Sequence, residues 1–215
     1  MNLWDYIQSR QELLTFEFLQ HASMIFQCLV VATILGVVIG IATYRNPTIA
    51  SFATGTAGVI FTIPALALLG LLIVPLGLGV APTVTALVLY GLLPIVRNTI
   101  LGLQGVDRVL VDAASGIGMS RARILLRVEL PMAWPVILTG IRVSTQLTMG
   151  IGAIAAYASG PGLGDQIFSG LSRIGGAGAL QSVLAGIIGV VVLALIFDAV
   201  FVLIGRFTTS RGIRV

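Results

Sequence analysis

The sequence predicts an all-α integral membrane protein: a bundle of about five transmembrane helices with one folded, charged loop in the cytoplasm. Three observations support this fold class. Only 9% of the 215 residues are charged and 57% are hydrophobic, whereas soluble domains carry about 25% charged residues. Five stretches come close to the roughly 20 mostly apolar residues that a spanning helix needs. Nearly all of the arginines fall in the gaps between those stretches.

The five stretches follow one another along a single membrane domain that covers residues 1–215. In order, they are 24–43, 50–74, 80–96, 134–158 and 183–205. The third is short, and the charge-free turn PLGLGVAP (75–82) separates it from the second, because glycine and proline break helices. In the first, Gly36 and Gly40 form a small-xxx-small pair, which suits close packing within one subunit or a seam between two.

The arginines orient the bundle, since cytoplasmic loops of membrane proteins are rich in basic residues. With five spans, only Arg10 and Arg173 fall on one side, and Arg142 lies within the fourth span. The other nine share the opposite side: Arg45, Arg97, Arg108, Arg121, Arg123, Arg127, Arg206, Arg211 and Arg214. We therefore expect the N-terminus outside and the C-terminus in the cytoplasm. The N-terminal segment lacks a basic region and a cleavage site, so no cleaved signal peptide is expected.

The cytoplasmic loop 97–131 contains two predicted helices. Asp107 is a good N-cap for the first, whose apolar residues share one face: Val109, Leu110, Ala113, Ala114 and Ile117. Gly118 suits the position after a helix where φ is positive. Ser120 can cap a second helix over 121–130, which ends at Pro131. From the residues alone this element is either a knob for a soluble partner or an amphipathic helix on anionic lipid.

The same passage resembles the EAA loop of permeases from binding-protein-dependent ABC importers. It has Asp112-Ala113-Ala114, then Gly118, then Leu130-Pro131, with Asp112 in place of the family's Glu and Val128 in place of its Ile. In that family the loop docks into a cytoplasmic ATPase and transmits its motion. The resemblance therefore implies a set of ATPase-coupling residues: Asp112, Ala113, Ala114, Gly118, Ser120, Arg121 and Arg123.

The resemblance also implies partners and a location. The expected partners are cytoplasmic ABC ATPase subunits, a second permease subunit, an extracytoplasmic solute-binding protein and membrane lipid. The second permease subunit is either identical to this chain or merely similar to it. No nucleic acid is expected. The expected location is the plasma membrane of a prokaryote. ATP would be bound by the ATPase subunit, so this chain needs no cofactor of its own.

Three further stretches look like the osmoprotectant branch of these permeases, which moves glycine betaine, carnitine, choline and related quaternary ammonium compounds. They are FTIPALALLGLLI (61–73), LYGLLPIVRNTILGLQGVD (89–107) and SGPGLGDQIFSG (159–170). The family commonly shows G-A-G-G-L-G where this chain has S-G-P-G-L-G at 159–164, and Pro161 stiffens that turn.

Two places are candidates for the translocation path or its gate. Thr62 and Pro64 lie within the second span, where a proline frees a backbone carbonyl; this is either a hinge on the path or a static kink. The turn after the fourth span is expected to form an outward gate or docking surface, through Gly160, Pro161, Gly162 and Gly164. His21, near the outer membrane edge, is given no role.

Two charges lie within spans. Asp198 and Arg142 are predicted at similar depth in the inner half of the membrane, so we expect them to pair, with Arg97 as the alternative partner and snorkelling as the alternative to pairing.

The sequence shows no Walker A motif, metal-ligand spacing, G-x-S-x-G or paired carboxylates, so neither an enzyme nor a metal site is expected. The alternatives are an ion-coupled secondary transporter or channel subunit, an ABC importer permease for another small solute, and a membrane scaffold.

Overall fold

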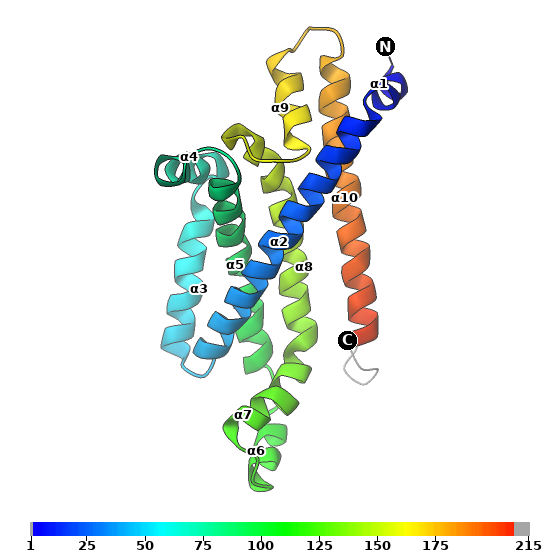
Figure 1. Cartoon of the computed structure of the whole chain (residues 1–215). Coiled ribbons are helices and arrows are strands. Elements are labelled where there is room, and N and C mark those ends of the chain that lie inside the picture. Colours follow the sequence, from blue (N-terminus) through cyan, green and yellow to red (C-terminus); the bar gives the residue numbers. More distant parts are fainter. Residues whose placement is uncertain (1, 209–215) are drawn as a thin grey trace.

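The computed structural model describes residues 2–208, which fold into helices joined by short turns, and no strand occurs in that range (Figure 1). Arg211 and Arg214 lie outside the described residues. The elements in chain order are α1 (Leu3–Ser9), α2 (Gln11–Thr43), α3 (Pro47–Thr62), α4 (Ala65–Leu76), α5 (Val80–Gln104), α6 (Arg108–Gly116), α7 (Arg121–Ile124), η1 (Leu125–Glu129), α8 (Leu130–Ile154), η2 (Ala155–Ala158), α9 (Gly164–Ser172) and α10 (Ala179–Thr208).

The core forms where α5 packs between α2 and α8, while α2 crosses the bundle diagonally (Figure 1). Ile25, Ile95 and Ile137 contribute fully buried side chains from these three helices. The glycine pair in α2 makes close packing possible: a Cβ on Gly36 would lie 2.7 Å from Cγ2 of Ile95, and one on Gly40 would lie 2.5 Å from Cγ2 of Thr99. The small-xxx-small pair therefore packs within one subunit.

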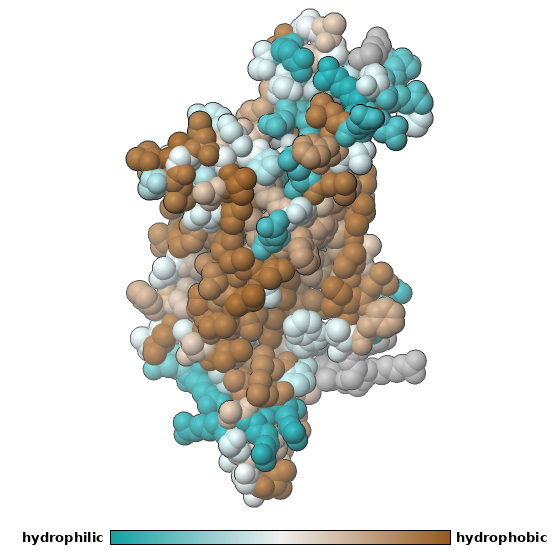
Figure 2. All heavy atoms as spheres, in the orientation of Figure 1, coloured by the Kyte–Doolittle hydropathy of each residue, from teal (hydrophilic) through white to brown (hydrophobic). Residues whose placement is uncertain are grey.

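On the face shown in Figure 2, apolar side chains cover the middle of the molecule, and polar side chains gather at its two ends. α2, α5, α8 with the helical turns that flank it, and α10 are each long and apolar enough to cross a membrane, and the pair α3–α4 would make a fifth span. One end of the bundle carries α6 and α7 and is called the loop end. The opposite, outer end carries α1, α4 and α9 (Figure 1).

The second span was expected as one helix over 50–74, and this expectation of a continuous helix is wrong. The chain breaks between α3 and α4, whose axes differ by 95°. Ile63 has extended backbone angles (φ −68°, ψ 128°) because the ring of Pro64 disfavours a helical conformation in the residue before it. α4 consequently lies across the outer end of the bundle instead of continuing α3 (Figure 1).

The expectation that Pro131 ends the second loop helix is also wrong. One helical rod runs from Arg121 through Pro131 to Ala158. It contains a π-helical turn, η1, which ends at Glu129, two residues before the proline. This turn widens the backbone where the proline ring would meet the preceding turn, so the rod continues. The third span is longer than expected, because α5 continues to Gln104.

Candidate functional site

The loop between α5 and α8 projects beyond the helix ends as a separate knob formed by α6 and α7 (Figure 1). Its helices begin where the sequence predicts. The side chain of Asp107 accepts a hydrogen bond from the backbone N–H of Val109 at 2.9 Å, and Ser120 Oγ accepts one from Arg123 at 3.4 Å. These two caps provide acceptors for backbone donors at the start of each helix.

Gly118 makes the turn between the two helices. Its φ is +81°, a value that favours glycine, although a Cβ there would meet nothing within 4 Å. The N–H groups of Gly118 and Met119 donate to the carbonyls of Ser115 and Ala114 at 2.9 and 3.1 Å, which closes the end of α6. Backbone conformation, not space, therefore requires the glycine.

Most of the residues predicted to contact an ATPase are accessible. Ala114 alone is buried; those that are exposed are Asp112, Ala113, Gly118, Ser120, Arg121 and Arg123. The knob also exposes large apolar side chains, with Val109 70% and Ile117 80% exposed. Exposed apolar side chains of this kind suit docking, either to a protein partner or to a membrane surface.

A hydrogen-bonded cluster joins η1, which follows the knob, to the α2–α3 turn. Tyr44 Oη donates to Glu129 Oε2 at 2.7 Å, and Arg45 Nε donates to Tyr44 Oη at 2.6 Å. Arg45 Nη2 also reaches Glu129 Oε2, at 3.3 Å. Burial, and then the hydrogen bond to the Glu129 carboxylate, raise the pKa of Tyr44 above its ordinary value. The sequence analysis did not predict this cluster. Its one signal in the sequence is the acidic residue Glu129, two residues before Pro131.

The break at Thr62–Pro64 is hydrogen-bonded to the core. Tyr90 of α5 donates its hydroxyl to the carbonyl oxygen of Ile63, the residue between them. Thr62 Oγ1 donates to Val59 O at 2.7 Å within α3. The carbonyl of Ile63, which lies in the break between the two helices, is therefore satisfied by a neighbouring helix. The carbonyl of Ile60, which the missing N–H of Pro64 leaves free, accepts instead from the N–H of Ile63 at 3.2 Å. Both Thr62 and Pro64 are exposed.

The glycine turn 160–164 is packed into the outer end. Gly160, Gly162 and Gly164 are buried, and Pro161 is half-buried. A Cβ on Gly162, where φ is +118°, would lie 2.8 Å from the Cβ of His21, and one on Gly164 would lie 2.1 Å from Ala153 O. These glycines permit close approach of the backbone to α2 and α8.

His21, which was given no role, lies beneath that turn and is fully buried, with Nε2 3.3 Å from Met149 O. One helical turn away, Glu17 accepts a hydrogen bond from Gln166 Nε2 at 3.1 Å, and Gln166 Oε1 accepts one from Tyr6 at 2.9 Å. This buried network joins α1, α2 and α9. A lone histidine in the sequence does not reveal it, because its partners lie more than 100 residues away.

Arg142 of α8 and Asp198 of α10 are in contact. The guanidinium makes two hydrogen bonds to the carboxylate, at 2.5 and 2.7 Å, and Gln146 Nε2 donates to the same carboxylate at 2.9 Å. The side chains are 41% and 26% exposed. Within residues 2–208, no group of three or more His, Cys, Asp or Glu side chains could hold a metal ion.

Comparison with known proteins identifies the family that the chain matches. Residues 32–210 match the family described as "Binding-protein-dependent transport system inner membrane component". The chain is 35% identical over 195 residues to the carnitine transport permease protein OpuCB of Listeria monocytogenes, covering 91% of this chain and 88% of that protein. It is 34% identical to the choline transport system permease protein OpuBB of Bacillus subtilis, covering 97% and 94%.

A third relative, the osmoprotectant import permease protein OsmW of Salmonella typhimurium, is 38% identical over 201 residues, covering 91% of each chain. Among solved structures, the MetNI methionine ABC transporter in an inward-facing conformation is similar, with a TM-score of 0.79 and 20% identity. The match covers 94% of this chain and 99% of that one. At that identity the likeness concerns the fold alone.

Proposed function

The chain belongs to the family of binding-protein-dependent transport system inner membrane components, and we propose that the solute it carries is a quaternary ammonium osmoprotectant such as glycine betaine, carnitine or choline. The chain is a multi-pass inner-membrane permease subunit of an ABC importer, and ATP hydrolysis takes place on a separate ATPase subunit. Family membership favours this role over the ion-coupled transporter, the channel subunit and the scaffold.

One observation carries the proposed solute class. Relatives from three organisms, each similar over about nine-tenths of the chain or more, are named for carnitine, choline or osmoprotectants. Carnitine and choline both carry a quaternary ammonium group. An ABC importer permease for another small solute is the alternative, and direct measurement of uptake tests it.

The knob is the proposed ATPase-coupling surface. Its support is geometric: two capped helices project from the loop end, and exposed apolar side chains such as Val109 and Ile117 lie beside exposed arginines. Within this proposal, the coupling residues are Asp112, Ala113, Ala114, Gly118, Ser120, Arg121 and Arg123. An external solute-binding protein, implied by the family, delivers the solute at the outer end.

A second permease subunit, identical or similar, completes the path in this proposal. A groove of about 630 Å³ between α3 and α5 exposes Ser51, Thr54, Arg97 and Gln104 on an otherwise apolar bundle. Polar groups at membrane depth favour water or protein over lipid. The path then runs between the two subunits. It passes Thr62 and Pro64 and the outer turn formed by Gly160, Pro161, Gly162 and Gly164. Lipid covers the remaining apolar surface.

Reconstitution tests the proposal. The permease, its ATPase and its binding protein are placed in proteoliposomes containing ATP, and uptake of labelled glycine betaine, carnitine and choline is measured. We expect ATP-dependent uptake of at least one of them and none with an ATPase unable to hydrolyse ATP. Methionine serves as the comparison solute. Uptake of methionine without any of the three would contradict the proposed solute class.

A further inference from the structure

We propose that Tyr44, Arg45 and Glu129 form a latch that transmits movement of the coupling loop to α3, and that Tyr44 and Glu129 are positioning residues for energy coupling. This inference rests on the proposed function, because it takes the loop to be the part that the ATPase moves. The three residues are called the loop latch below.

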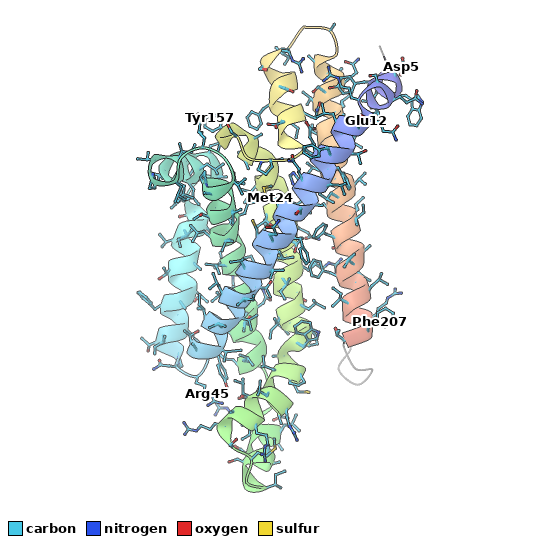
Figure 3. All side chains as sticks on the ribbon, viewed as in Figure 1. Asp5, Glu12, Met24, Arg45, Tyr157 and Phe207 are labelled. Atoms are coloured by element: carbon cyan, nitrogen blue, oxygen red, sulfur yellow. The ribbon has the colours of Figure 1, made fainter. Side chains whose placement is uncertain are left out.

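The loop latch connects segments far apart in the sequence. Tyr44 and Arg45 occupy the short turn between Thr43, where α2 ends, and Pro47, where α3 begins. Glu129 lies 85 residues beyond Tyr44, at the end of η1, where the coupling loop returns to the membrane. Figure 3 shows Arg45 at the loop end of the bundle, facing the knob.

The contacts of the loop latch are specific. The buried carboxylate of Glu129, with its side chain 8% exposed, accepts hydrogen bonds from Tyr44 and from Arg45 through one oxygen. Arg45 also lies over the Tyr44 ring, 5.2 Å from its centre. A buried acid without donors is strongly disfavoured, so these contacts hold η1 against the α2–α3 turn.

Both legs of the coupling loop bond to the same residue. The loop leaves the membrane at the end of α5, where Gln104 Nε2 donates to the backbone carbonyl of Tyr44 at 2.9 Å. It returns through η1, where Glu129 accepts from the Tyr44 hydroxyl. A displacement of the knob relative to the bundle therefore acts on Tyr44 through η1 and Glu129, whereas Gln104 ties the Tyr44 backbone to the end of α5.

From Tyr44 the displacement reaches α3. Asn46 caps α3 through hydrogen bonds from the N–H groups of Thr48 and Ile49 at 3.0 and 3.3 Å, so the turn and the helix move as one body. α3 is weakly held, since Ala50 and Ala57 are its only buried residues. α2, in contrast, is fixed against α5 by the close packing of Gly36 and Gly40. Movement therefore passes along α3 to the break before Pro64.

A cleft beside the loop latch gives the knob room to move. It has a volume of about 590 Å³ and is lined on one side by Tyr44, Arg45 and Glu129 and on the other by Arg108 and Asp112 of α6. Open space thus lies between α6 and the turn, and the loop latch connects the two legs across it.

The test measures coupling in proteoliposomes that contain the whole transporter. Tyr44→Phe removes one hydroxyl and keeps the ring, and Glu129→Gln keeps the size and removes the charge. For each, we expect ATP consumed per solute imported to rise about threefold or more, because a charge-assisted hydrogen bond holds the two parts together. Thr43→Val is the matched control, since the Thr43 hydroxyl bonds only within α2, to Ile39 and Gly40.

Rescue separates coupling from folding. Exchanging the charges, Arg45→Glu with Glu129→Arg, should recover part of the coupling that either single substitution loses. Thermal melting of the purified complex identifies any variant that simply fails to fold. If Tyr44→Phe and Glu129→Gln fold and match Thr43→Val in ATP per solute, the loop latch plays no part in coupling. Absence of uptake by the wild-type transporter would instead contradict the proposed function.

Discussion

The guanidinium of Arg142 and the carboxylate of Asp198 form a two-bonded ion pair between α8 and α10, with N–O distances of 2.5 and 2.7 Å. The pair lies where α10 has few other attachments. Beyond Leu193, no residue of α10 as far as Thr208 is buried. Near the loop end, the Trp134 indole donates to Thr208 Oγ1 at 2.7 Å. The ion pair is therefore a principal link between the inner half of α10 and the bundle.

Replacing one partner of this ion pair should destabilise the subunit more than replacing both. Arg142→Leu leaves an unpaired carboxylate at membrane depth, and Asp198→Leu leaves an unpaired guanidinium, which the membrane disfavours. The double substitution to leucine leaves neither charge. We expect each single variant to melt several degrees below the wild type in detergent and the double variant to melt above both. A double variant no more stable than the singles would show that the pair makes specific contacts that leucines cannot replace.

Substitution of Gly118 should uncouple transport from ATP hydrolysis. At φ +81° an alanine is strained by about 1–2 kcal/mol, so Gly118→Ala should weaken the turn, and Gly118→Asp should weaken it further because it adds bulk and charge. Uptake should fall while membrane insertion and ATPase activity persist. Gly116→Ala is the matched control, because Gly116 also has nothing within 4 Å but has no positive φ. Equal uptake by the two alanine variants would contradict a role for the backbone conformation.

Local chemistry made the knob predictable. The caps at Asp107 and Ser120 and the positive φ of Gly118 depend on neighbouring residues alone, and all three are confirmed. The break at Pro64 was placed correctly, but its 95° angle was not predicted, and neither was the hydrogen bond by which Tyr90 of another helix satisfies the Ile63 carbonyl there. The prediction that a helix ends at Pro131 was wrong because the helix propensity of proline does not reveal the π-helical turn before it.

Long-range polar contacts were the least predictable. Arg142 and Asp198 could be paired from the sequence because their predicted depths in the membrane matched and few other charges compete there. Tyr44 and Glu129 lie at the membrane edge, where solvent offers many alternatives to pairing. His21 was assigned no role because a lone polar residue near the membrane edge is most often interfacial. Its burial depends instead on how closely the glycine turn at Gly162 approaches it.

Close packing of α2 on α5 should make Gly40 intolerant of larger residues. A valine at Gly40 meets the Thr99 side chain, where even a Cβ would lie 2.5 Å from Cγ2, and overpacking of this kind costs roughly 1–3 kcal/mol. Gly40→Val should lower the melting temperature of the purified subunit. Gly55→Ala in α3, where a Cβ meets nothing within 4 Å, serves as the comparison. If Gly40→Val has the same melting temperature as the wild type, α2 is not held tightly against α5. The proposal that movement passes through α3 and not α2 would then lose its basis.

Loss of the Tyr90 hydroxyl should alter the outer half of the path. Tyr90→Phe leaves the Ile63 carbonyl without this donor, which costs about 1–3 kcal/mol if the group stays buried. We expect slower uptake with near-normal binding of the solute-binding protein, because the junction of α3 and α4 loses its link to α5. Thr85→Val on the same helix removes a hydroxyl that bonds only to Ala81 within α5, at 2.9 Å. A rate for Tyr90→Phe equal to that of Thr85→Val would mean that the junction needs no such link.

The permease should contribute little to solute affinity. Proteins bind quaternary ammonium groups tightly with several aromatic faces through cation–π attraction. Among residues 2–208 one aromatic pair is found, Phe61 and Tyr90, with ring centres 5.9 Å apart. Tyr90 is 3% exposed, and its hydroxyl is engaged by Ile63. No three aromatic rings therefore contact one another in the described residues of one subunit.

Exchange of the binding protein tests where selectivity resides. We expect the permease with its ATPase alone to import solute slowly and without preference, and uptake with the cognate binding protein to follow that protein's specificity. A related binding protein of different specificity, added to the same proteoliposomes, should change the preferred solute, because the described residues show no group of contacting aromatic rings that would retain the original one. ATP hydrolysis stimulated by each binding protein shows that both dock. Selective, high-affinity uptake without any binding protein would place the recognition site in the permease, between the two subunits.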